Sequence, residues 1–532
     1  MDRLFDFKKS QARWNEEWSR SKVLTPDAAS PREPFVIILP PPNVTGVLTV
    51  GHVLGATVMD LLIRWKRMCG FNSLWLPGTD HAGIATQKVV ENHLLTEGKK
   101  RTEMGRDEFL THCWIWKERH HARIVEQLNN LGCALDWTRE CFTLDDERSR
   151  AVREVFVRLY EKGLIYRGNY IVNWCPSCGT AISDEEVYHL EKDAKLFWIR
   201  YPINDGSFVT VATTRPETML GDTAVAVNPD DESKQHLIGK TATLPIIGRK
   251  LPIIADELVD REFGTGFVKV TPAHDPNDFE MGQRHGLAHV VVIDRQGKMT
   301  AEAGEPFVGL DRFECRDRIL QTLQEQGLLE KIEPYHHSVG LHDRCKTVIE
   351  PLLSREWFVK MKPLAGPALE AVEHGDIELY PPRWKNVYVN WMSNIKDWCI
   401  SRQLWWGHRI PVWYCADGHI TVARDDPAAC GTCGSARLIQ DEDVLDTWFS
   451  SWLWTLSPLG WPDDTEDLET FHPTSVLVTA PDIIFFWVAR MIMASLEFKQ
   501  EIPFKHVFFT GIVRDMEGRK MSKSLGNSPD PL

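Results

Sequence analysis

The sequence contains no apolar run long enough to span a membrane, so no transmembrane helix is predicted. It also contains no internal repeat and no low-complexity tract, which excludes a repeat array or a disordered polar protein from the expected classes. The opening residues, MDRLFD, are mixed and charged and do not resemble a secretory signal. Together these absences predict a soluble, cytoplasmic protein without a membrane partner.

An excess of positive charge is missing too. The chain of 532 residues carries a net charge of −14, which argues against non-specific nucleic-acid binding by the whole surface. This charge leaves room for a local basic groove. The apolar content of 43% is typical of globular cores, and the length is sufficient for several domains.

Disulfides are not expected among the 12 cysteines of a cytoplasmic chain. Cysteines and histidines instead form two groups with the spacing of zinc ligands. The first group is Cys175, Cys178, His342 and Cys345, and the second is Cys415, His419, Cys430 and Cys433. Four protein ligands leave no open position for a substrate, so each group predicts one structural Zn²⁺. The alternative is a set of reduced cysteines without metal.

The chain divides into four segments by pattern. Residues 1–34 are predicted to form a leading helix and a linker. Short apolar strands alternate with longer helical patterns in residues 35–190 and 336–532, which favours two halves of one α/β domain with a Rossmann-like parallel sheet. Residues 191–335 are rich in strand-like pieces, glycine and proline, and indicate an inserted β-rich domain. The first zinc knuckle would pin both stems of this insert side by side.

Near the C-terminal end, residues 520–524 read KMSKS. They lie between Gly518 and Gly526, which predicts a mobile loop that carries two lysines. Ammonium groups on such a loop can neutralise the phosphate charge that develops during phosphoryl or nucleotidyl transfer. Alone the segment is a weak signal, because most charge runs are solvated surface.

A second motif lies in the N-terminal part of the chain. An apolar run at 35–39 is followed by PPPNVTG at 40–46, then by TVGH at 49–52 and an apolar-periodic helix. This order places His52 at a helix N-terminus, where free N–H groups and the helix dipole favour an anion. Gly51 allows a ligand to approach the backbone closely.

Together the two motifs resemble the signatures of class I aminoacyl-tRNA synthetases. The segment 77–87, PGTDHAGIATQ, is similar to that of the valyl-tRNA synthetases in this family, and the resemblance extends from about residue 35 to the last residue. It implies activation of L-valine with ATP and Mg²⁺, and transfer of valine to tRNA(Val), by a monomer. It also implies a helical anticodon-binding domain after residue 532, so the sequence is expected to be a fragment or a truncated product.

The sequence departs from the family pattern at two positions. Thr49 stands where the family has the first histidine of its signature, and His342 stands where cysteine is more common. A threonine hydroxyl can hydrogen-bond a phosphate but carries no charge, whereas zinc accepts histidine in place of cysteine. Two other interpretations stay open: an isoleucyl-type synthetase, and a non-catalytic tRNA-binding fragment.

For the synthetic site, the resemblance implies a phosphate-handling group and an amino-acid-binding group. The first is Thr49, Gly51, His52, Lys520 and Lys523 for catalysis, with Ser522 added for ATP binding. The second is Pro41, Asn43, Asp80, Trp454, Ile483 and Trp487. Asp80 would pair with the α-ammonium group. The last three would form a pocket for a small β-branched side chain, with a helix predicted from about residue 483 to 493; alternatively they are ordinary core.

A pocket sized for valine cannot strongly reject the nearly isosteric threonine, so a second, hydrolytic site is expected. The resemblance implies that the insert carries it, on Thr213, Thr214, Arg215, Thr218, Lys269, Thr271, Asp275 and Asp278. Asp278 would bind the ammonium group of the misattached amino acid, and Asp275 and Lys269 would recognise the threonine hydroxyl. The alternative is that these side chains serve turns in β-loops.

Overall fold

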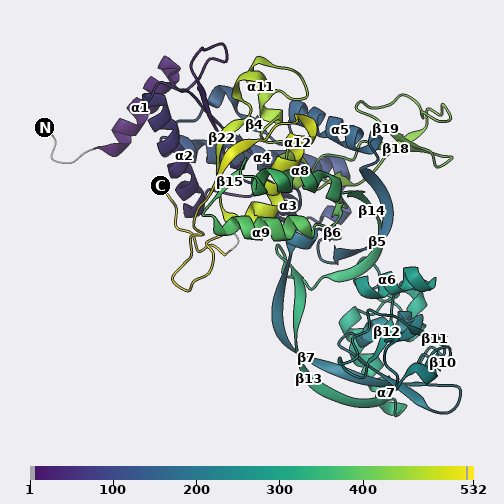
Figure 1. Cartoon of the computed structure of the whole chain (residues 1–532). Helices are drawn as coiled ribbons and strands as arrows, with labels where there is room; N and C mark the ends of the chain where they lie inside the picture. The colour runs from purple at the N-terminus through teal and green to yellow at the C-terminus, as the bar shows by residue number, and fades with distance from the viewer. Residues whose placement is uncertain (1–5, 523–524) are drawn as a thin grey trace. The chain divides into compact units, whose positions relative to one another are not determined.

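The computed structural model of the chain describes residues 6–522 and 525–532 (Figure 1). Its backbone contacts divide the chain into two compact units. Unit 1 consists of Met1–Tyr166 and Phe358–Leu532, and unit 2 consists of Arg167–Trp357. Among the described helices, none combines the length and apolar character needed to cross a bilayer.

The first half of unit 1 contains a parallel β–α–β unit. Strands β1 (Pro34–Ile38) and β2 (Asn72–Leu76) pair in parallel register, with α2 (Val50–Met68) between them in the chain. β2 is buried along its whole length, as is typical of a parallel strand covered on both faces. The other elements of this half are α1 (Phe7–Ser21), β3 (Gly78–Thr79), α3 (Gly83–Thr96), α4 (Arg106–Asn130), β4 (Cys141–Phe142) and α5 (Asp146–Glu161).

The second half of unit 1 adds three parallel strands in the order β15 (Glu378–Tyr380), β23 (Phe504–Phe509), β22 (Thr474–Thr479). The backbone N–H of Val36 in β1 donates to Ser475 Oγ of β22 over 2.9 Å. β1 and β22 therefore lie side by side, although more than 400 residues separate them in the chain (|i−j| = 439). This arrangement confirms the predicted parallel α/β fold.

The remaining elements of this half surround that sheet. The helices are α8 (Lys362–Glu373), α9 (Arg383–Ser393), α10 (Trp448–Ser451), α11 (Glu466–Phe471) and α12 (Ala489–Phe498). The short strands are β16 (Trp398–Cys399), β17 (Ser401–Arg402), β18 (Val412–Cys415), β19 (Ile420–Val422), β20 (Leu438–Gln440) and β21 (Val444–Leu445).

The predicted helix from about residue 483 differs from the structure in its first turn. A 3₁₀ turn (Pro481–Ile483) leads into a π-helical turn (Ile484–Val488), and α12 begins only at Ala489. Phe485 stacks on Trp391 and Phe486 stacks on Trp448. The sequence pattern predicted an ordinary α-helix here, whereas the structure has a wider turn of five residues.

Unit 2 is rich in β-structure, as predicted, and contains the whole of the predicted insert, residues 191–335. One sheet has the order β13-β7-β8, another has the order β10-β11-β9-β12, and β14, β5 and β6 belong to a further sheet. Figure 1 shows β7 and β13 as a long paired ribbon. The elements are β5 (Ile165–Cys175), β6 (Thr180–Ile182), β7 (Val187–Pro202), β8 (Phe208–Thr213), β9 (Ala224–Val227), β10 (Thr241–Thr243), β11 (Lys250–Ala255), β12 (Phe267–Val270), α6 (Pro276–His285), α7 (Arg312–Glu325), β13 (Leu329–His342) and β14 (Glu350–Val359), of which β5 and β14 continue into unit 1.

Candidate active site and metal centres

The start of α2 is built by Thr49 and His52. Thr49 is the N-cap residue, and its hydroxyl lies 2.7 Å from His52 Nδ1. The backbone N–H of Thr49 donates to the same ring nitrogen over 3.1 Å. Threonine is a favoured N-cap residue, so the departure from histidine at this position has a structural function in starting the helix. His52 and Gly51 are exposed at the helix N-terminus.

The chain just after the lysine-rich segment contacts this helix start. Ser528 Oγ accepts a hydrogen bond from the backbone N–H of Val50, the first residue of α2, over 3.2 Å. Lys520 forms an ion pair with Asp482, one residue before Ile483. Ser528 thus links the chain after the lysine-rich segment to the start of α2, and Lys520 contacts the residue before Ile483. Lys523 lies outside the described residues.

Asp515 organises the approach to Lys520. Its carboxylate accepts hydrogen bonds from the backbone N–H of Arg519 over 2.8 Å and from Asn527 Nδ2 over 2.8 Å. The hydrogen bond from Asn527, assisted by Arg519, lowers the pKa of Asp515 to about 2. The backbone N–H of Ser522 in turn donates to Asn527 Oδ1 over 2.9 Å. Lys520 and Ser522 therefore lie in a hydrogen-bonded loop.

Asp80 lies opposite Asn43. The backbone N–H of Val44 donates to Asp80 O, and that of Asp80 donates to Pro42 O, each over 3.0 Å. This parallel bridge fixes Asn43 beside Asp80. Pro41, the remaining member of this predicted group, is half-buried in the same segment.

The Asp80 carboxylate is 6% exposed, and among the described residues no lysine or arginine pairs with it. Its Oδ1 accepts the backbone N–H of Ala82 over 2.6 Å. Burial first, and then the negative charge of Asp446, raise the pKa of Asp80 to about 7. His81 Nδ1 lies 3.7 Å away, but burial keeps that ring neutral by lowering its pKa. A cationic ligand would supply the counter-charge that this carboxylate lacks.

The two predicted pocket tryptophans are almost completely buried. Trp454 Nε1 donates to the backbone carbonyl of Leu39 over 3.0 Å, and Trp487 Nε1 donates to that of Ser451 over 2.8 Å. A Cβ added to Gly78 would lie 2.3 Å from Trp454 Cζ2, so only glycine permits this contact two residues before Asp80. Trp454 is thereby placed against the Asp80 segment.

Ile483 is half-buried at the end of its 3₁₀ turn. A hollow of about 550 Å³ is lined by Asn386, Val387, Asn390, Trp391, Asn394 and Phe485. It includes none of the predicted substrate residues. Asp482 was not among the predicted residues, although its position beside Ile483 could have indicated it.

A second polar site lies in unit 2, around Asp222. This carboxylate accepts hydrogen bonds from Thr271 Oγ1 over 2.6 Å and from the Tyr201 hydroxyl over 2.7 Å. Lys269 Nζ donates to Thr271 Oγ1 over 2.5 Å and lies 3.5 Å from Asp222. Burial raises the pKa of Asp222, and the Lys269 ammonium opposes that rise. Neither Asp222 nor Tyr201 stood out in the sequence, because nothing in it indicates their proximity to Lys269.

Asp278 adjoins this network. Its Oδ2 accepts the backbone N–H of Thr271 over 2.8 Å. Burial and the nearby charge of Asp275 raise the pKa of Asp278 to about 7. Asp275 itself is the N-cap of α6 and accepts the N–H groups of Asn277 and Asp278 over 2.9 and 3.2 Å. The structure therefore brings Lys269, Thr271, Asp275 and Asp278 together.

The predicted threonine-rich segment is held by Arg215. The arginine pairs with Glu350 and with Glu217, and its Nη1 donates to the His274 carbonyl over 3.1 Å. Thr213 Oγ1 accepts the backbone N–H of Arg215 over 3.0 Å, and Thr218 Oγ1 donates to its carbonyl over 3.0 Å. Thr214, between them, is half-buried. Both the side chain and the backbone of Arg215 therefore have partners within unit 2.

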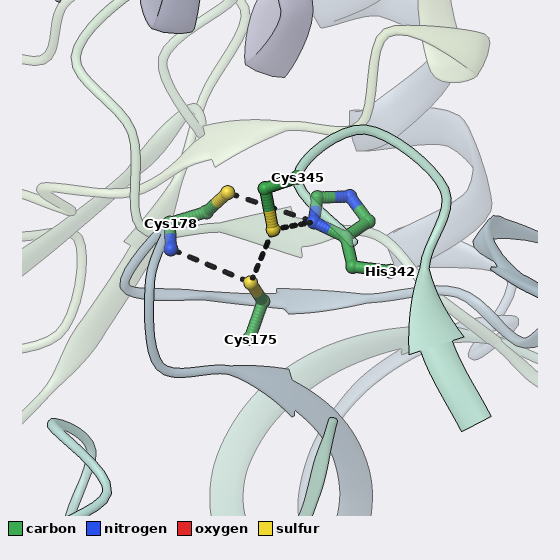
Figure 2. A group of neighbouring side chains, drawn as sticks. All are labelled: Cys175, Cys178, His342 and Cys345. Atoms are coloured by element: carbon green, nitrogen blue, oxygen red, sulfur yellow. Dashed lines mark hydrogen bonds between the residues drawn. The ribbon is translucent and has the colours of Figure 1, made fainter. Parts of the chain in front are cut away.

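The first cysteine and histidine group converges in unit 2 (Figure 2). Cys175 Sγ lies 3.4 Å from Cys345 Sγ, and His342 Nδ1 lies 3.2 Å from Cys345 Sγ and 3.5 Å from Cys178 Sγ. The ligand atoms of all four residues lie within 4.8 Å of one another. His342 Nε2 faces Asp343 Oδ1 at 3.6 Å, as the outer carboxylate of a zinc-bound histidine does. The donor set fits a closed Zn²⁺ site.

The second group converges in unit 1. Cys415 ends β18, and its Sγ lies 3.4 Å from His419 Nδ1 and 3.7 Å from Cys433 Sγ. The antiparallel pairing of β18 with β19 brings His419 back toward Cys415. Cys430 completes the group, whose ligand atoms also lie within 4.8 Å of one another. These donors too fit a structural Zn²⁺, and Cys433 is the exposed member.

Comparison with known proteins defines the class. A family model described as tRNA synthetases class I (I, L, M and V) matches residues 11–532, so the chain belongs to this family. Among curated relatives, it is 58% identical over 524 residues to valine–tRNA ligase of Carboxydothermus hydrogenoformans. It is 57% identical over 525 residues to valine–tRNA ligase of Thermotoga maritima. These alignments cover 98% of this chain and 60% of each relative, so the chain spans about three-fifths of their length.

A solved structure supports the fold. The ternary complex of LeuRS with tRNA and LeuAMS from Agrobacterium radiobacter K84 matches with a TM-score of 0.55 and 19% identity. The match covers 99% of this chain and 70% of that one. The class I synthetase fold inferred from the two sequence motifs is thereby confirmed.

Proposed function

We propose that unit 1 is the activation centre of a valine–tRNA ligase, which condenses L-valine with ATP and delivers valine to tRNA(Val). The observation that carries the proposal is Asp80, a buried carboxylate that pairs with no lysine or arginine among the described residues, in the same unit as the two phosphate-binding motifs. The choice of valine as the amino acid rests on the similarity of the chain to valine–tRNA ligases.

In the first step a valine carboxylate oxygen attacks the α-phosphorus of ATP. The new O–P bond forms as the bond to the β-phosphate breaks, and pyrophosphate leaves. Asp80 holds the valine ammonium group by a charge-assisted pair, while Asn43 lies beside it. This orientation lowers the barrier because the two reactants are held together before reaction.

Two parts of the chain would stabilise the negative charge of the ATP phosphates: the start of α2 and Lys520. The N-terminus of α2, with the positive end of its helix dipole and exposed His52, faces the phosphates in this proposal. Lys520 offers a positive charge once ATP replaces Asp482 as its partner. Mg²⁺ bound to ATP would neutralise the leaving pyrophosphate. In the second step a hydroxyl of the terminal tRNA adenosine attacks the valyl carbonyl, and AMP leaves.

We further propose that unit 2 hydrolyses threonyl-tRNA(Val). Asp278, buried beside the backbone N–H of Thr271, would bind the threonine ammonium group. Lys269 and Thr271 offer polar atoms to the threonine hydroxyl, a group that valine lacks. Two structural Zn²⁺ ions, one in each cysteine and histidine group, would stabilise the knuckles.

The test is ATP–pyrophosphate exchange with a panel of valine, isoleucine and threonine. The proposal predicts that valine gives the highest kcat/KM, with threonine about a hundredfold lower. Highest activity with isoleucine would support the isoleucyl-type alternative. No exchange with any amino acid, together with retained tRNA binding, would support a non-catalytic fragment.

A further inference from the structure

The turn that follows Asp80 is held in a strained conformation. Ala82 has φ 49° and ψ 58°, in the left-handed region that residues with a side chain rarely adopt. The backbone N–H of Ala82 donates to Asp80 Oδ1 over 2.6 Å. In this conformation the Ala82 N–H points at the Asp80 carboxylate and orients it. Such strain persists only where surrounding contacts enforce it.

Three hydrogen bonds from distant parts of unit 1 enforce this turn. Thr447 Oγ1 accepts the backbone N–H of Gly83 over 2.8 Å. Thr143 Oγ1 accepts the backbone N–H of His81 over 2.9 Å. Trp406 Nε1 donates to the His81 carbonyl over 2.8 Å. His81 and Gly83 are thus held by hydrogen bonds, and Ala82 lies between them.

The contact between Thr447 and Gly83 depends on the absence of a side chain at Gly83. A Cβ added to Gly83 would lie 2.9 Å from Thr447 Oγ1, so the glycine is required for the hydroxyl to reach the backbone. Ala82 is the N-cap of α3 but provides no side-chain cap. The Thr447 hydroxyl supplies an acceptor from elsewhere in the chain to this helix start.

Thr447 is itself fixed by its neighbour. Asp446, almost fully buried, accepts hydrogen bonds from Arg402 Nη2 over 2.8 Å and from Trp398 Nε1 over 2.9 Å. The backbone N–H of Asp446 donates to the Ile400 carbonyl over 2.7 Å. These contacts form a rigid support for the Thr447 hydroxyl.

We propose that Thr447 is a positioning residue for amino-acid recognition, because its hydroxyl holds the Asp80 turn in the conformation that presents the carboxylate to the substrate ammonium group. This inference rests on the proposed activation of valine. Thr447 acts through Gly83 and Ala82 and does not contact the substrate. Loss of its hydroxyl therefore affects recognition of the amino acid and leaves recognition of ATP intact.

The experiment compares Thr447→Val with Thr447→Ser in ATP–pyrophosphate exchange, measuring KM for valine and for ATP separately. Valine has nearly the shape of threonine and lacks the acceptor, whereas serine keeps it. The matched control is Thr86→Val on α3, because Thr86 is fully buried and its hydroxyl has no partner among the described residues. Thr143→Val removes a second acceptor from the same turn and serves if Thr447→Val does not fold.

Thr447→Val is expected to raise KM for valine about 3- to 10-fold, the equivalent of one hydrogen bond, with KM for ATP within about twofold of the unaltered chain. Thr447→Ser should restore KM for valine, and Thr86→Val should not change it. An unchanged KM for valine, an equal rise in both KM values, or failure of serine to restore binding would overturn the inference. Absence of valine-dependent exchange in the unaltered chain would instead overturn the proposed function on which it rests.

Discussion

Asn43 and Asp80 face one another in a parallel β-bridge that joins the loop after β1 to the segment after β3. Both loops follow the carboxyl ends of strands, the edge of an open α/β sheet where ligands bind. The backbone hydrogen bonds between Val44, Asp80 and Pro42 lock the two loops together. An amino acid held by Asp80 would therefore meet Asn43 without any rearrangement of the backbone.

Asp80→Asn should stabilise the unliganded protein, and more so at high pH. The pKa of Asp80 is raised from 3.8 to about 7, so between these values the folded protein holds a proton that the unfolded chain has released. Stability of the unaltered protein thus falls as pH rises from about 4 to about 7. Asparagine can still accept the Ala82 N–H and does not ionise.

Denaturant unfolding of both proteins at pH 4.5 and pH 8 measures this effect. The gain in unfolding free energy should be small at the lower pH and roughly 2–4 kcal/mol at the higher one. An equal gain at both pH values would show that Asp80 does not titrate in this range.

Two zinc ions per chain are expected after purification without chelator. The group containing Cys433 should release its zinc first, because Cys433 is exposed whereas His342 is fully buried in the other group. Elemental analysis during dialysis against a weak chelator measures the order of release. Cys433→Ser should lower the stoichiometry to about one, and Cys345→Ser should do the same. A stoichiometry of one in the unaltered chain would rule out one site.

Asp278→Ala should abolish deacylation of preformed threonyl-tRNA(Val), because it removes the proposed partner of the threonine ammonium group. Valine-dependent exchange should be retained, since Asp278 belongs to unit 2 and the activation site belongs to unit 1. Glu280→Ala is the matched control, an exposed acid on the same helix, α6. The tRNA should be supplied near saturation. Retained hydrolysis in Asp278→Ala would assign that carboxylate a purely structural role.

Lys520→Ala should reduce kcat for exchange about 10²- to 10³-fold, as is usual when one electrostatic donor to a transition state is lost. KM for valine should change little, because Asp80 and Asn43 remain in place. Lys505→Ala removes an exposed lysine from β23 and controls for net charge. Near-normal kcat in Lys520→Ala would show that the described ion pair with Asp482 is the only function of this lysine.

The sequence predicted the elements whose signals are local. Alternation of apolar strands and helices predicted the parallel sheet, and the spacing of cysteines and histidines predicted ligands that converge within 4.8 Å. The contacts that decide the site were not predictable in the same way. Thr447 meets Gly83 from 364 positions away, and no periodic pattern indicates such a contact. The π-helical turn before α12 was also missed, because the apolar pattern there is the same as that of an α-helix.

Threonine at position 49 shows how a local departure can be understood once the fold is known. From the sequence, it removed a histidine from the phosphate-binding motif. In the structure it is the N-cap of α2 and contacts His52 Nδ1 at 2.7 Å. Its hydroxyl therefore orients the remaining histidine, although it carries no charge of its own.

The most direct test of the account is KM for valine in ATP–pyrophosphate exchange by the unaltered chain and by Asp80→Asn, measured at saturating ATP. The variant keeps the shape of the side chain and its bond to Ala82 but cannot offer a charge to an ammonium group. The account predicts valine-dependent exchange in the unaltered chain and a rise in KM for valine of about 10- to 150-fold in the variant, since a hydrogen bond to a charged group contributes about 1.5–3 kcal/mol. Equal KM values for valine in the two proteins would contradict it.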